Sequence, residues 1–97
     1  MILEMKKYEL VLLFADSVAA EDQEKVLAKI EKDIKDMIGK LNAKNNLGKK
    51  ELAYVMKKVH RATFWHLKIE LPVEQISAFR RKLTLNDTIL RFLLVIE

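Results

Sequence analysis

The sequence has no cysteine, one proline and two glycines among its 97 residues. Without cysteine there is no disulfide framework, no thiolate metal site and no cysteine nucleophile. The longest apolar runs, such as Leu10 to Ala15, are far too short to cross a bilayer. The N-terminus MILEMKKYE carries charge where a signal peptide needs an apolar segment. These absences predict a cytoplasmic protein with no membrane segment.

Apolar residues are plentiful, at 51% of the chain, which excludes disorder. Ninety-seven residues suffice for one domain, expected to span residues 1–97, with one sheet and one layer of helices.

The positive charge is concentrated in the middle of the chain. Residues 40–68 carry eight Lys or Arg against Glu51 alone, whereas residues 1–39 carry six Lys against nine Asp or Glu. A strand with lysines at its ends is either a solvated sheet edge or a contact for a phosphate backbone. The size of the local excess favours a polyanion, with nucleic acid as the first candidate.

Hydrophobic periodicity predicts six elements, with period two for strands and spacings of three and four for helices. Asp16 and Ser17 suit the start of the first helix, and Gly39 suits its end. Leu41 to Asn46 is expected to be a loop or a frayed strand. The predicted order is strand, helix, strand, strand, helix, strand, at Lys7 to Phe14, Asp16 to Gly39, Lys50 to Lys57, Arg61 to Leu71, Pro72 to Leu83, and Ile89 to Ile96.

This order predicts an α+β, ferredoxin-like split βαβ fold (βαββαβ), a four-stranded antiparallel sheet with two helices on one face. Right-handed crossovers place the first and third strands in the centre. The closing strand is almost wholly apolar and is therefore expected to be internal. The sheet face without helices is expected to carry a mixture too apolar for water alone, namely Glu9, Val11, Leu13, Phe64, His66, Lys68, Ile89, Arg91, Leu93 and Val95.

Several short motifs occur together on this frame. Tyr8-Glu9 opens the first strand, Gly48-Lys49-Lys50 precedes Leu52-Ala53-Tyr54, Lys57-Lys58-Val59-His60-Arg61-Ala62 precedes an aromatic strand, and Asn86-Asp87 precedes the last strand. In this order and spacing they resemble the bacterial small-subunit ribosomal protein six family over nearly the whole chain. Val55 stands where family members usually have proline, so this strand is expected to pair more continuously.

The resemblance implies a structural component of the small ribosomal subunit, located on the cytoplasmic ribosome and without catalytic activity. It implies binding to the central domain of small-subunit rRNA, side by side with small-subunit ribosomal protein eighteen as a heterodimer.

Seven residues of the basic segment are candidates for rRNA contact: Lys49, Lys50, Tyr54, Lys57, Lys58, His60 and Arg61. Cationic groups gain from each phosphate they neutralise, through counterion release. Tyr54 could stack on a base or ribose, or could equally be a core tyrosine. The lysines could be solvated edge residues, and His60 a solvated side chain.

Phe64, His66 and Arg91 are candidates for binding a protein partner on the uncovered face. Phe64 suits an apolar anchor, although it could simply pack at the sheet edge. Arg91 could serve the partner or the RNA. His66 has no second ligand at metal spacing, and no metal or cofactor is expected. Trp65 lies on the core-facing side of the strand's alternation, and the sequence has no RNA-recognition consensus. Trp65 is therefore not expected to stack on RNA bases. The solvent-exposed face of the second helix is expected to carry Arg80, Arg81 and Lys82.

Two other classes of function remain as alternatives. An acylphosphatase-like hydrolase needs a phosphate cradle, and neither Gly39 nor Gly48 lies in a Gly-rich loop before a helix. A dimerising regulatory domain would pair through its uncovered sheet face. The leading hypothesis instead expects a monomer when the chain is isolated.

Overall fold

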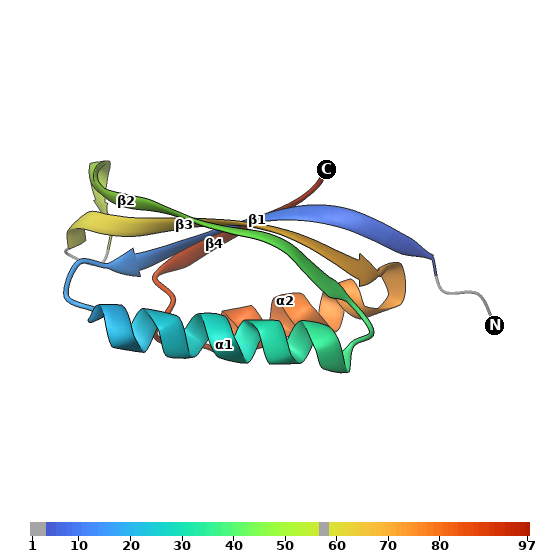
Figure 1. Ribbon diagram of the computed structural model, residues 1–97. Coiled ribbons are helices and arrows are strands. Elements are labelled where there is room, and N and C mark those ends of the chain that lie inside the picture. Colours follow the sequence, from blue (N-terminus) through green and yellow to red (C-terminus); the bar gives the residue numbers. More distant parts are fainter. Residues whose placement is uncertain (1–3, 57–58) are drawn as a thin grey trace.

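The computed structural model describes residues 4–56 and 59–97, and for residues 52–56 and 59 it describes the backbone only. The chain forms a four-stranded antiparallel sheet in the order β2-β3-β1-β4. Both helices lie on one side of this sheet (Figure 1). The elements are β1 (Met5–Ala15), α1 (Ala20–Asp36), β2 (Lys40–Met56), β3 (Val59–Pro72), a 3-10 turn η1 (Val73–Gln75), α2 (Ile76–Thr84) and β4 (Arg91–Ile96). The predicted split βαβ topology is confirmed.

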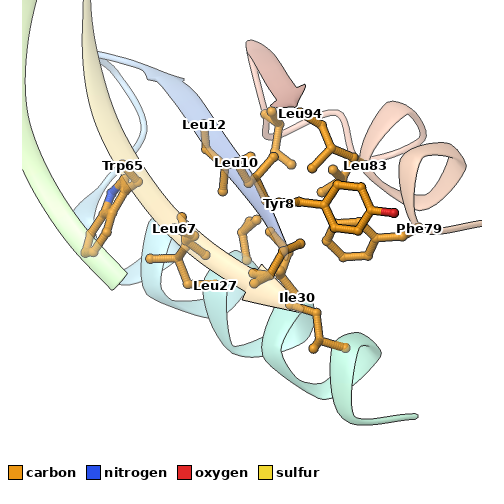
Figure 2. Close-up of a cluster of buried hydrophobic side chains, with 14 of the residues drawn as sticks. Tyr8, Leu10, Leu12, Leu27, Ile30, Trp65, Leu67, Phe79, Leu83 and Leu94 are labelled. Atoms are coloured by element: carbon orange, nitrogen blue, oxygen red, sulfur yellow. The ribbon is translucent and has the colours of Figure 1, made fainter. Parts of the chain in front are cut away.

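The core fills the space between the sheet and the helices. Figure 2 shows leucines of β1 and β3 pointing towards apolar side chains of α1 and α2. Leu10, Leu12 and Leu67 are fully buried, and each contributes about 1.5–3 kcal/mol by leaving water. Thr63, Trp65, Leu67, Ile69 and Leu71 lie on the core side, as their alternation predicts, and all are buried.

Trp65 is fixed in this core by a polar relay from α1. Its indole Nε1 donates to Gln23 Oε1 at 3.0 Å, and Gln23 Nε2 donates to the Val18 carbonyl at 3.0 Å. Gln23 is only 6% exposed. The relay therefore satisfies the one indole donor without leaving a buried amide unpaired.

Both predicted boundaries of α1 are wrong. Ala19 is the N-cap and makes no side-chain capping bond, while Asp16 lies outside the helix in another interaction. At the other end the helix stops at Asp36, before Gly39, and Ile38 is 67% exposed and adopts φ 63°. Gly39 follows it against β3, where a Cβ would overlap the Glu70 carbonyl and approach Leu71 Cδ2 to 2.7 Å. Gly39 is thus needed for close packing.

The two edge strands also differ from expectation. The segment expected to be loop or frayed, Leu41 to Asn46, belongs to β2, which accommodates it with irregularities between Leu41 and Ala43 and between Asn46 and Gly48. Pairing with β3 is again irregular between Glu51 and Met56, so Val55 does not bring a continuous ladder. β4 lies at an edge rather than inside the sheet, because its crossover places it beyond β1.

Candidate nucleic-acid interface

The predicted rRNA-binding residues with a described backbone belong to β2 and β3, at the end of the sheet where these two strands meet. Of these residues, Lys49, Lys50, His60 and Arg61 have described side chains, and all four are exposed. The side chain of Tyr54 lies outside the described part of the chain, as do Lys57 and Lys58 altogether. The term basic edge is used below for Lys49, Lys50, His60 and Arg61.

The two adjacent lysines of the basic edge lie on opposite faces of the sheet. Lys49 pairs with Thr63, whose side chain is on the helix side, whereas Lys50 pairs with Ala62. The Lys50 ammonium is 5.6 Å from the centroid of the Phe64 ring, on the face without helices. The sequence places both lysines in one candidate rRNA-contact segment, and strand alternation directs the two side chains to opposite sides of the sheet.

Lys49 is held by a carboxylate at the end of β1. Its Nζ lies 2.9 Å from Asp16 Oδ1, and about half of each side chain is exposed. The hydrogen bond from Lys49, its charge and the charge of Arg61 hold the pKa of Asp16 below its ordinary value, despite some opposing desolvation. The Asp16 backbone N–H also donates to the Arg61 carbonyl at 3.2 Å. Asp16 thus lies within the basic edge.

This position of Asp16 was missed because its partners are distant in sequence. The local pattern, Asp16-Ser17 before a helix, is typical of capping and gives no sign of a lysine on β2. Only the antiparallel register of β1 with β3, and of β3 with β2, brings these groups together.

The open face denotes the following residues on the side of the sheet away from the helices: Glu9, Val11, Leu13, Phe64, His66, Lys68, Arg91, Leu93 and Val95. They form three rows across β3, β1 and β4. The rows are Phe64, Leu13 and Arg91; His66, Val11 and Leu93; and Lys68, Glu9 and Val95. The three predicted partner-binding residues therefore lie in neighbouring rows.

Exposed apolar side chains concentrate on the β4 side of the open face. Leu93 is 58% exposed and Val95 is 42% exposed, whereas Leu13 is almost covered by its neighbours. Phe64 is half-buried and lies opposite Gly48, whose φ of 85° favours glycine. His66 Nε2 lies 3.7 Å from Glu9 Oε1. The face combines an apolar strip with charged side chains.

Ile89 was expected on the open face but is 7% exposed and belongs to the core. It precedes the first residue of β4, so the alternation of the strand does not extend to it. The cationic cluster on α2 is exposed, as interpreted, yet it also makes contacts within the protein. Arg80 Nη2 donates to the Leu94 carbonyl at 3.5 Å, and Lys82 Nζ lies 3.4 Å from Asp33 Oδ1.

Within residues 4–56 and 59–97, no three His, Asp or Glu side chains are grouped so as to hold a metal ion. Among the helices of the described part of the chain, none is long and apolar enough to span a membrane.

The strand order and the two helices on one side define a ferredoxin-like domain. Its open face lies beside the basic edge. A sequence profile described as ribosomal protein S6 matches residues 7–95. The chain belongs to the ribosomal protein S6 family, as its motifs suggested.

Relatives and a solved structure agree with this family. Small ribosomal subunit protein bS6 of Dictyoglomus turgidum is 28% identical over 92 residues, covering 95% of each chain. The bS6 protein of Trichlorobacter lovleyi is 26% identical over 91 residues, covering 94% of this chain and 75% of the relative. The fold is similar to crystalline 30S ribosomal protein S6 of Thermotoga maritima, with a TM-score of 0.88 and 18% identity over 97% of this chain and 89% of the other.

Family membership also settles the broad class of function. The protein is a structural component of the small subunit of the cytoplasmic ribosome and is not an enzyme. Association with ribosomal RNA is consistent with that role. The hydrolase alternative is therefore not retained.

Proposed function

We propose that this protein binds the central domain of small-subunit rRNA together with small-subunit ribosomal protein eighteen, using two different surfaces. The observation that carries the proposal is that the cations of the basic edge and the most exposed apolar side chains of the open face lie in different places. Lys49 and Arg61 offer cations at the basic edge, while Leu93 and Val95 expose apolar side chains on the open face. Phosphate contacts suit the first surface and a protein partner suits the second.

Phe64, His66 and Arg91 support the partner assignment because they lie in adjacent rows of the open face. Phe64 supplies an aromatic side chain, and aromatic and arginine residues are enriched where interfaces derive their binding energy. Lys50 lies above Phe64, so we assign it to the border of the partner surface as well as to RNA contact.

Mobility-shift titrations test the function directly, using a central-domain rRNA fragment with and without the partner protein. We expect a shift in the presence of the partner that weakens steeply as salt rises. Arg61→Ala should reduce the salt slope by roughly 0.7–0.9 for each phosphate that the arginine neutralises. Lys29→Ala, an exposed lysine of α1, removes the same charge away from the edge and should leave the slope unchanged. Absence of any shift with the partner present would refute the proposal.

The partner surface has its own matched pair of variants. Leu93→Glu places a charge on the open face, whereas Leu85→Glu places one on a leucine that is 73% exposed after α2. Calorimetric titration with protein eighteen should show at least tenfold weaker binding for the first and unchanged binding for the second. Equal affinities for both variants would remove the open face from the interface.

We further propose that the isolated chain is a monomer. Sedimentation equilibrium should give the mass of one chain, 11.3 kDa, without the partner and a one-to-one complex with it. A stable homodimer of the pure chain would favour the dimerising alternative instead.

A further inference from the structure

The candidate phosphate contact Lys49 is already occupied by an anion belonging to the same chain. Its ammonium lies 2.9 Å from the Asp16 carboxylate, within hydrogen-bonding distance. The lowered pKa of Asp16 keeps this carboxylate ionised throughout the physiological range. In the free protein, Lys49 therefore presents little net charge to its surroundings.

We infer that Asp16 is an intramolecular competitor for Lys49, so that a phosphate gains this lysine only by displacing or sharing the carboxylate. This inference rests on the proposed RNA binding and identifies which residue limits it. Asp16 also lies within the field of Arg61, the other described cation on the same side of the edge. One carboxylate thus weakens the attraction of two cations for an incoming phosphate.

The geometry makes this competition reversible. Lys49 is 56% exposed and Asp16 is 41% exposed, so both groups can regain water when they separate. Ion pairs this accessible contribute little to stability, because water and salt screen them. A phosphate with further contacts to the edge can therefore displace Asp16, whereas a weakly held polyanion meets a nearly neutral Lys49.

The consequence is a limit on indiscriminate binding. A basic edge without the carboxylate would release one more counterion to any nucleic acid and would bind it more tightly. With the carboxylate present, affinity depends more on the other groups that the RNA and the partner engage. Asp16 thereby lowers the affinity for generic polyanions without needing to touch them.

Asp16→Asn tests the inference with little change in shape. Against single-stranded oligouridylate at low salt, we expect about two- to fivefold tighter binding, the range corresponding to an exposed ion pair. The plot of log affinity against log salt should steepen by roughly 0.7, the value for one more phosphate neutralised on a single strand.

Asp36→Asn is the matched control for the change in net charge. Asp36 is exposed at the last residue of α1, roughly 24 Å along the helix from its start. Screening at physiological salt makes a charge at that distance nearly ineffective. The control should change affinity less than the Asp16 variant and leave the salt slope as it is. Equal gains for the two variants would overturn the inference.

Lys49→Ala completes the test. In the Asp16→Asn background it should remove most of the gain, because the freed lysine is the main cause and Arg61 interacts with Asp16 through charge alone. An undiminished gain without Lys49 would contradict competition, as would weaker binding by Asp16→Asn, since the carboxylate would then be contacting the RNA itself. Matching urea midpoints would show that the variants are equally folded. Tighter oligouridylate binding without recognition of central-domain rRNA would uphold the competition and refute the proposed function.

Discussion

The bond between Trp65 and Gln23 allows a stringent test of how the sheet is fixed to α1. Gln23→Met keeps the length of the side chain but removes both of its hydrogen bonds. The indole N–H, in a residue only 6% exposed, then has no described partner. A buried donor left without a partner costs about 1–3 kcal/mol. A loss of about 2 kcal/mol lowers the melting temperature by roughly 8–16 °C in a domain of this size.

Urea unfolding followed by far-ultraviolet circular dichroism is the suitable assay, because Trp65 is the only tryptophan and is itself replaced in the next variant. Trp65→Phe removes the donor as well as part of the ring. In the double variant no donor is left unpaired, so its loss should be smaller than the sum of the single losses by about 1–2 kcal/mol.

Gln75→Met is the control, since Gln75 is half-buried in η1 and substitutions away from specific contacts usually change stability by less than about 0.5 kcal/mol. Strict additivity of the Gln23 and Trp65 changes would refute the reasoning, as would a Gln23→Met loss no larger than that of the control.

Three further predictions concern other contacts. Because the folded-state pKa of Asp16 lies below 3.8, its pair with Lys49 stabilises the fold above the ordinary carboxyl pKa and loses that effect as the pH falls through the lowered value. Carboxyl NMR titration should therefore show a higher Asp16 pKa in Lys49→Ala, and an unchanged pKa would contradict the pairing. Gly39→Ala should destabilise the fold by about 1–3 kcal/mol, because its Cβ would overlap the Glu70 carbonyl; an unchanged urea midpoint would contradict this. Finally, Lys50→Ala should alter affinity for the protein partner whereas Lys49→Ala should not, because the two side chains lie on opposite faces; calorimetry showing equal effects would argue against the assignment.

Much of the fold could be predicted from periodicity alone. The alternation from Thr63 to Leu71 identifies the buried side of β3 because a central strand of a one-sided sheet must keep one face in the core. The same reasoning failed for the edges. β4 is apolar without being internal, since Leu94 faces the core while Leu93 and Val95 lie on the open face. The composition of a strand gives the number of its apolar residues, but it does not show which of them are covered by other elements.

The candidate site was less predictable because it depends on register. Irregular pairing extends β2 through a polar, Asn-containing segment that has no clear period. Lys49 and Lys50 could be assigned to a basic segment, but only the pairing of β2 with β3 shows that they point apart. Asp16 gave a local capping signal that its long-range contact with Lys49 overrides.

The bond from Arg80 to Leu94 has a consequence for the life of the protein before assembly. An unpaired edge strand is a template on which another chain can add, and β4 combines such an edge with exposed apolar side chains. Arg80 occupies one edge carbonyl and places a charge beside it. This contact makes β4 a poorer template for strand addition by a second copy than a bare edge would be. A helix residue with no assigned part in binding thus blocks one hydrogen-bonding position on an exposed sheet edge.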